Sequence, residues 1–281
     1  MENEKVLRVF PRRTNASPDD ANARFGLPTF FDEADRILVS VTFDTDIEKG
    51  ERLAKEWECV APVEIGGPAL GDPGGEFTPG MFVKNGFTVT SRGCPNSCWF
   101  CRAWRNEGHK MRTLKIKDGY NILDNNILAC PDWHVKKVFA MLKRQKERPR
   151  FTGGFESKIL KLWHIDYIKE LNPSVMWFAY DTPDDYEPLV HASKLLTEAN
   201  IIRKSSHASC CYVLIGWKND TFDEAEKRLQ QVVELGFFPQ AMLFNSGVHF
   251  DDGLRRQWKR FARTWANKII VGFKIRKHND K

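Results

Sequence analysis

The chain has 281 residues and a formal net charge of +6; 42% of its residues are hydrophobic and 28% are charged. This is a globular composition, and the length allows one large domain, or a large and a small one. No run approaches the ~18 apolar residues of a membrane-spanning helix, and the first residues lack the apolar core of a signal peptide. We therefore expect a cytoplasmic protein with no membrane contact. In that reducing compartment its seven cysteines would bind metal or act in catalysis rather than form disulfides.

The first 85 residues predict a small α/β appendage. Residues 36–43 are rich in β-branched side chains and predict a strand. A short helix over 47–57 and a second strand over 60–65 follow. In the next stretch, 66–80, nine of fifteen residues are glycine or proline, which predicts a loop or a boundary. The appendage is too short to be a complete nucleotide- or cofactor-binding domain.

From residue 86 onward, short apolar runs alternate with amphipathic segments. Residues 135–142 place their apolar side chains on one helical face, and Thr221 with Glu224 predicts a capped helix start. The repeated alternation predicts an α/β fold of parallel strands joined by crossover helices. After residue 250 we expect a basic amphipathic helix over 254–265 and a last strand over 269–275. The six strands expected before that are 87–90, 120–123, 150–152, 175–180, 212–215 and 240–244.

Three cysteines lie close together in the segment FTVTSRGCPNSCWFCRAW. Cys94, Cys98 and Cys101 have the spacing Cys-x-x-x-Cys-x-x-Cys, so one loop can wrap around a 4Fe–4S cluster and bind three of its irons. Ferredoxin-type electron carriers supply a fourth cysteine, but the next one here is Cys130. The fourth iron would then be open to an exchangeable ligand. The loop also follows an expected strand, and ligand sites of parallel α/β folds lie at the carboxyl ends of strands.

Other roles for the three cysteines stay open. Together with His109 they could form a structural zinc site of the Cys₃His type, although the spacing is not that of a zinc finger. The alternatives are therefore a non-catalytic zinc or iron–sulfur module, an electron-transfer protein, and a set of unrelated or redox-paired thiols. The remaining cysteines match no ligand pattern for an auxiliary cluster and fit better as small buried hydrophobic residues. They are Cys59, Cys130, Cys210 and Cys211.

The cysteine spacing, with the aromatic Phe100 just before the last cysteine, resembles the signature of the radical SAM (S-adenosylmethionine) superfamily. The preceding Ser-Arg-Gly, residues 91–93, resembles the branch that contains methylthiotransferases and cobalamin-dependent enzymes. This resemblance implies a partial (β/α)₆ barrel over residues 86–250, with an N-terminal appendage over 1–85 and a C-terminal extension over 251–281. It also implies an enzyme whose reduced 4Fe–4S cluster cleaves SAM to methionine and a 5′-deoxyadenosyl radical, which abstracts hydrogen from a substrate.

Contacts to SAM are expected at the ends of the strands. Many family members hold its amino group with Gly-Gly-Glu after the second strand, whereas this chain reads Leu-Asp-Asn-Asn. Asp124 and Asn125 are then the candidates, unless their side chains only stabilise a turn. Adenine is expected against the apolar strand that ends in Gly216, a segment that could also be simply a buried parallel strand. The remaining candidates are Phe100, Gly153, Gly154, Glu156 and Asp181.

Partners follow from the same resemblance. The enzyme would need an external reductant such as flavodoxin or ferredoxin. Its substrate is not specified by the sequence, but the lateral opening of a partial barrel would admit a macromolecule. Basic runs over 102–117 and 143–150 favour nucleic acid over peptide, unless they are solvated faces and loops. A cobalamin partner normally comes with a complete N-terminal domain, for which 85 residues are too few.

Overall fold

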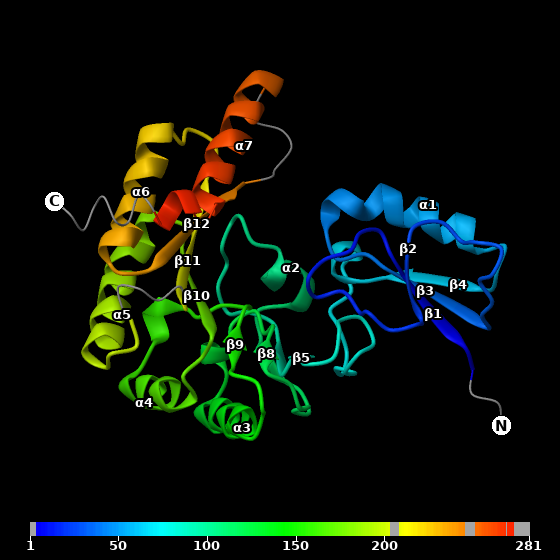
Figure 1. Cartoon of the computed structure of the whole chain (residues 1–281), viewed down its shortest axis with the longest axis horizontal. Helices are drawn as coiled ribbons and strands as arrows, with labels where there is room; N and C mark the ends of the chain where they lie inside the picture. The colour runs from blue at the N-terminus through cyan, green and yellow to red at the C-terminus, as the bar shows by residue number, and fades with distance from the viewer. Residues whose placement is uncertain (1–3, 203–207, 245–250, 268, 273–281) are drawn as a thin grey trace. The chain divides into compact units, whose positions relative to one another are not determined.

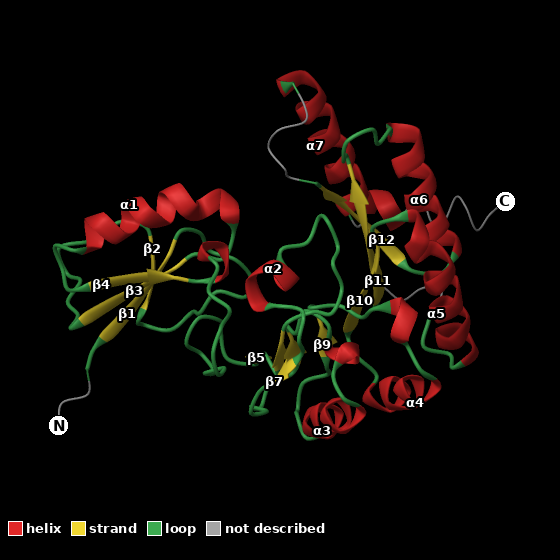
Figure 2. Cartoon of the chain, turned by 180° about the vertical axis from the view of Figure 1, so that it is seen from behind, coloured by secondary structure: helices red, strands yellow, loops and turns green. Residues whose placement is uncertain are grey.

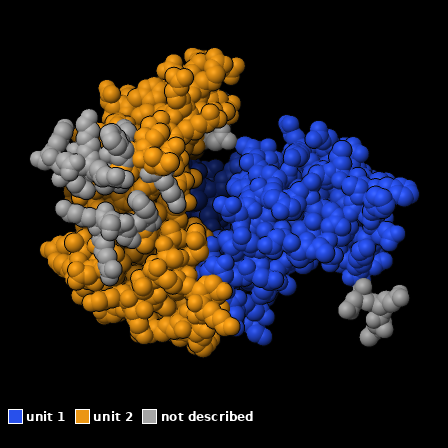
Figure 3. Space-filling model, viewed as in Figure 1, with its two compact units in different colours: residues 1–125 blue, residues 126–281 orange. Residues whose placement is uncertain are grey.

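The computed structural model describes residues 4–202, 208–244, 251–267 and 269–272. The chain divides into two compact units, Met1–Asn125 (unit 1) and Asn126–Lys281 (unit 2), shown in separate colours in Figure 3. Both units contain parallel strands and helices, which confirms the α/β class. No helix in the described ranges is long and apolar enough to cross a membrane. The boundaries expected at residues 85 and 250 stay predictions.

Unit 1 begins with a parallel sheet in the order β2-β1-β3-β4, covered by the helix α1 (Ile47–Trp57) (Figure 1). The side chain of Trp57 is fully buried, and its Nε1–H donates to the carbonyl of Gly26 at 2.9 Å. The helix and the strands expected near 36–43 and 60–65 are confirmed, whereas the first two strands were not predicted. The strands are β1 (Val6–Phe10), β2 (Ala23–Phe25), β3 (Arg36–Ser40) and β4 (Val63–Gly66).

The rest of unit 1 contains two short strand pairs. The strands β5 (Phe87–Thr88) and β8 (Asn121–Ile122) pair in parallel. Between them in the chain, β6 (Ser91–Arg92) and β7 (Arg112–Thr113) pair antiparallel. The connection from β6 to β7, residues 93–111, holds all three clustered cysteines and the short helix α2 (Ala103–Glu107), and we name it the cysteine loop.

Unit 2 is built on four parallel strands in the order β12-β11-β10-β9. The helices α5 and α6 lie along the same side of these strands (Figure 2). The strands are β9 (Arg150–Phe151), β10 (Val175–Tyr180), β11 (Ser209–Ile215) and β12 (Phe238–Leu243). The helices are α3 (Asp132–Lys143), α4 (Leu162–Leu171), α5 (Tyr186–Glu198), α6 (Phe222–Glu234) and α7 (Asp252–Ala266).

The sequence pattern located these elements well. The apolar residues expected on one face of α3 are at most 1% exposed, and Thr221 Oγ1 accepts the backbone N–H of Glu224 at 3.2 Å, as expected for a helix cap. All six expected strands are present, two of them in unit 1 and four in unit 2.

The strand expected over 269–275 is wrong where it can be compared, because residues 269–272 are helical. The side chain of Asn267 accepts the backbone N–H groups of Ile269 at 3.0 Å and Ile270 at 3.3 Å. An asparagine in this position caps a helical turn and overrides the strand preference of the isoleucines. Residues 273–275 lie outside the described ranges.

Candidate metal centre

The cysteine loop is closed at its base by backbone geometry. Ser91 pairs with Thr113 and Arg92 with Arg112, which forms a two-rung stem. Gly93 leaves the stem with φ +91°, and a Cβ on it would lie 2.5 Å from the carbonyl oxygen of Lys110. Only glycine therefore fits at the point where the loop begins.

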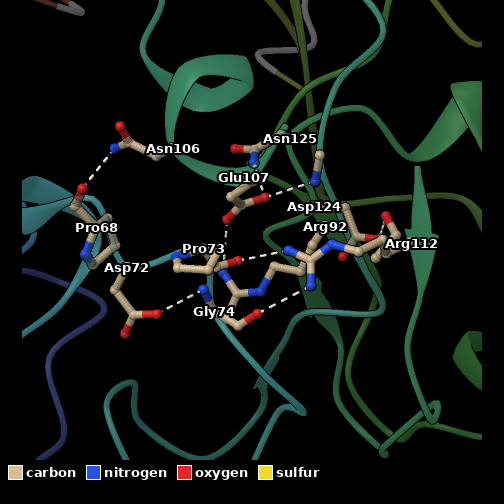
Figure 4. Close-up of polar contacts among 12 residues, drawn as sticks. Pro68, Asp72, Pro73, Gly74, Arg92, Asn106, Glu107, Arg112, Asp124 and Asn125 are labelled. Atoms are coloured by element: carbon tan, nitrogen blue, oxygen red, sulfur yellow. Dashed lines mark hydrogen bonds and ion pairs between the residues drawn. The ribbon is translucent and has the colours of Figure 1, made fainter. Parts of the chain in front are cut away.

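Glu107, the last residue of α2, fastens this base (Figure 4). Its carboxylate accepts the backbone N–H of Gly93 at 2.8 Å and the side-chain amide of Asn125 at 2.6 Å. It also forms an ion pair with Arg92 at 2.9 Å. The Glu107 side chain is only 10% exposed, and charged hydrogen bonds in such a position are stronger than neutral ones. The start of the loop, the end of its helix and the segment that follows β8 are thus held by one carboxylate.

Asp124, the residue proposed for the SAM amino group, forms hydrogen bonds at the start of the same stem. One oxygen accepts the backbone N–H of Thr90 at 2.7 Å, and the other accepts the hydroxyls of Thr90 at 2.6 Å and Ser91 at 2.5 Å. The residue is 1% exposed. Burial raises the pKa of Asp124, against the opposing effect of these hydrogen bonds. Asp124 therefore joins the start of β6 to the segment that follows β8, and a SAM contact by it stays a prediction.

The three cysteines are half-buried, and a short turn joins Cys98 to Cys101. The backbone N–H of Cys101 donates to the carbonyl of Cys98 at 3.1 Å, and the indole N–H of Trp104 donates to the same carbonyl at 2.9 Å. The backbone N–H of Ala103 points to the sulfur of Cys101 at 3.4 Å. Amide hydrogen bonds to sulfur are among the interactions by which proteins tune an iron–sulfur cluster, so the donor set and its surroundings fit such a group.

Aromatic residues lie beside the cysteines in the chain and contact one another. The ring of Phe100 meets the half-exposed ring of Trp99 edge-on at 5.3 Å. His109, the histidine of the zinc alternative, is exposed and stacks on Trp104 at 4.8 Å. Across the described residues, no three His, Cys, Asp or Glu side chains converge as ligands of a single metal ion. A cluster needs no such convergence, because each cysteine binds a different iron.

The glycine-rich segment 66–80 packs against the stem of the cysteine loop within unit 1. The guanidinium of Arg112 donates to the carbonyls of Pro73 at 2.7 Å and Gly74 at 3.2 Å (Figure 4). Gly74 has φ +66°, and a Cβ on it would lie 2.7 Å from the guanidinium carbon of Arg92. The segment expected to be a loop or boundary therefore helps to hold the stem of the cysteine loop in place.

The basic runs over 102–117 and 143–150, expected to favour a nucleic acid, partly form ion pairs and hydrogen bonds within the protein. In the first run, Arg102 pairs with Asp44 at 2.7 Å, and Arg112 is held as described above. In the second run, Lys143 pairs with Glu170 at 2.5 Å. These contacts favour the alternative of ordinary surface faces for the two runs.

Two candidate SAM contacts in unit 2, Glu156 and Asp181, form hydrogen bonds within that unit. Glu156 accepts the side-chain amide of Asn126 at 2.5 Å. Asp181 follows β10, and its backbone N–H donates to the carboxylate of Asp185 at 3.1 Å. Burial raises the pKa of Asp181 to about 7, and the negative charge of Asp185 adds to this effect. A carboxyl that titrates near neutrality at a strand end is a feature of functional sites.

The candidate glycines of unit 2 differ in the space around them. Gly153 is exposed, and Gly154 has φ +99° with only the carbonyl of Trp177 near its missing side chain, at 3.7 Å. Gly216 has φ +69°, and a Cβ there would lie 2.6 Å from Leu243 and 3.2 Å from Trp258. Packing by these side chains already explains the glycine at 216.

Sequence reasoning missed Glu107 and the hydroxyls of Thr90 and Ser91. The available signal is the Ser-Arg-Gly run before Cys94, which carries the family resemblance and whose first two residues form one side of the stem. Comparison with known proteins adds no assignment, because no protein-family model matches the chain and no curated protein matches it significantly. The candidate site therefore depends on the residues and geometry described above.

Proposed function

We propose that this chain is a radical SAM enzyme in which Cys94, Cys98 and Cys101 bind a 4Fe–4S cluster. The observation that carries the proposal is the Cys-x-x-x-Cys-x-x-Cys spacing on one short loop, whose ends are paired in the β6–β7 stem and whose start is fastened to α2 by Glu107. The amide hydrogen bond to the sulfur of Cys101 also supports the proposal, since such donors surround the sulfur ligands of iron–sulfur clusters.

When bound, the reduced cluster would supply the electron that cleaves SAM to methionine and a 5′-deoxyadenosyl radical for hydrogen abstraction. The three cysteines hold three irons, and the absence of a fourth cysteine from the motif leaves one iron for SAM. Glu107 and Asp124 act as positioning residues, because each joins the base of the loop to the strands beside it. Precise placement matters here, since a cluster ligand on a loose loop would shift relative to its neighbours.

The proposal extends to the fold, the electron donor, the substrate and the SAM contacts. It includes the partial (β/α)₆ barrel over 86–250, a flavodoxin or ferredoxin as electron donor, and a nucleic acid or peptide as substrate. The half-exposed Trp99 beside the cysteines offers an apolar contact for such a donor. The proposed SAM contacts are Phe100, Asp124, Asn125, Gly153, Gly154, Glu156, Asp181 and Gly216.

The test is anaerobic reconstitution of the full chain with iron and sulfide, followed by addition of dithionite and SAM. We expect a brown protein that absorbs near ~400 nm, as thiolate-bound clusters do, and that releases 5′-deoxyadenosine. Cys94→Ala, Cys98→Ala and Cys101→Ala should each abolish that product. Cys59→Ala is the matched control, because Cys59 is exposed in unit 1 outside the loop, and it should retain full activity.

Three outcomes would contradict the proposal. A colourless zinc protein that leaves SAM intact would identify the structural zinc module. A brown protein whose spectrum ignores SAM would identify an electron carrier with all irons closed. Product formation by all three loop variants would refute the ligand assignment.

A further inference from the structure

The helix α7 presents a basic face to solvent. It contains five basic residues and one acidic residue, Asp252, in a chain whose net charge is +6. Arg256, Lys259, Arg260 and Arg263 follow the i, i+3, i+4, i+7 spacing of one helical face, and all four are exposed. We name these four residues the α7 basic face.

The α7 basic face lines a surface groove of ≈ 770 Å³. The neutral residues Gln257, Thr264 and Asn267 line it as well, and no carboxylate is among its described lining residues. Within the described ranges, none of the four cations forms an ion pair. This differs from Arg102 and Lys143 in the other basic runs, which are paired with carboxylates. The described lining residues therefore gather positive charge along one face of α7, which raises the local potential for anions.

The opposite face of α7 is already covered by the protein. Trp258 and Trp265 are each 1% exposed. Trp258 stacks on Phe222 of α6 at 4.2 Å, and the indole N–H of Trp265 donates to Glu226 at 2.6 Å. A basic amphipathic helix binds a membrane by inserting its apolar face, and here that face is used in the fold. The exposed charge is therefore suited to a soluble polyanion rather than a lipid surface.

We propose that the α7 basic face binds the phosphodiester backbone of a nucleic acid. From Arg256 to Arg263 the helix rises about 10 Å at 1.5 Å per residue, which matches about three nucleotide steps at 3.4 Å each. Arginine predominates among the four, and its planar guanidinium can bind phosphate oxygens in pairs. This inference rests on α7 alone and does not depend on the proposed radical chemistry.

The test is fluorescence anisotropy of the full chain with labelled single-stranded RNA and duplex DNA of about 20 nucleotides or base pairs. With four phosphate contacts, affinity should fall about 50-fold for the single strand and about 150-fold for the duplex between 50 and 200 mM salt. In Arg256→Gln/Arg260→Gln two contacts remain, so the fall for the single strand should shrink to about 7-fold. The ligand that binds more tightly shows whether the α7 basic face prefers single-stranded RNA or duplex DNA.

The control is Lys169→Gln/Lys194→Gln, which removes two exposed charges from α4 and α5 and should bind like the wild type. Circular dichroism melts of both double variants verify that they fold. No binding at 50 mM salt, equal loss in both double variants, or an unchanged salt dependence in the α7 variant would overturn the proposal. Capture by phosphatidylserine vesicles without nucleic-acid binding would also overturn it, in favour of a membrane. Because binding is read without SAM, failure here leaves the radical SAM proposal intact, and loss of cluster activity leaves this one intact.

Discussion

The carboxylate of Glu107 accepts the backbone N–H of Gly93 at 2.8 Å, so the end of α2 is fastened to the residue that precedes the first cysteine. Glu107→Ala removes this acceptor and the partner of Arg92 together. We expect a loss of about 1–3 kcal/mol in unfolding free energy and a lower iron content after reconstitution. Glu107→Gln keeps an acceptor for the backbone amide of Gly93. Its unfolding free energy and its iron content should therefore lie between those of the wild type and those of Glu107→Ala. Urea unfolding and iron analysis measure both effects. Equal iron retention by Glu107→Ala and by Glu51→Ala, an exposed carboxylate on α1, would contradict this role.

Asp124 is matched to three donors, two of them hydroxyls. In Asp124→Asn the amide offers one acceptor oxygen, and its NH₂ group faces donors instead of acceptors. We expect a loss of about 2 kcal/mol or more, because buried donors are left unsatisfied. Thermal unfolding measures it, with the exposed Asp19→Asn as the control that should be neutral. If both variants melt together, Asp124 does not anchor the loop.

Alanine substitutions at Gly93 and Gly71 distinguish the cost of a steric collision from the cost of a strained backbone. Both have positive φ, +91° and +79°, but a Cβ on Gly93 meets the Lys110 carbonyl at 2.5 Å, whereas one on Gly71 meets nothing within 4 Å. Gly71→Ala should cost about 1 kcal/mol for its left-handed backbone. Gly93→Ala should cost more than about 2 kcal/mol and lower iron binding, because the loop must open at its base. Chemical denaturation compares them, and an equal cost would show that the close approach at Gly93 is not limiting.

His164 makes folding sensitive to acid. Its Nδ1 accepts the backbone N–H of Lys161 at 2.9 Å at the start of α4. Burial lowers its pKa from 6.5 to about 4, and the charge of Lys161 adds to this effect. As pH falls below 6.5 the unfolded chain takes up a proton that the folded chain refuses, so this contribution to stability is complete above that pH and is lost toward pH 4. The slope should reach at most about 1.4 kcal/mol per pH unit.

His164→Asn keeps an acceptor for Lys161 and cannot titrate. The difference in urea-unfolding free energy between wild type and variant should therefore change between pH 6.5 and 4. Taking this difference removes the opposing contribution of Asp181, whose raised pKa of about 7 makes the folded state more stable as pH falls. A constant difference across that range would show that His164 does not titrate as described.

The sequence by itself determined the elements whose signals are local. Residues 135–142 carry their apolar side chains at helical spacing, and Thr221 precedes Glu224 at the spacing of a cap, so both helices form where the pattern places them. The cysteine spacing is also local, which is why it predicts a cluster ligand set without a fold. The strand expected over 269–275 failed at its start because one side chain, Asn267, supplied a cap that outweighs the β-propensity of its neighbours.

Only the tertiary structure decided how the cysteine loop is held. Glu107 lies 14 residues from Gly93 and 18 from Asn125 along the chain, and Asp124 lies 34 from Thr90; no periodicity relates such positions. A carboxylate has the same appearance in a sequence whether it is solvated or buried against three donors, because burial is a property of the folded chain. The same reason governs the basic residues. Arg102 and Arg260 look alike in sequence, but the fold pairs the first with Asp44 and leaves the second facing an open groove.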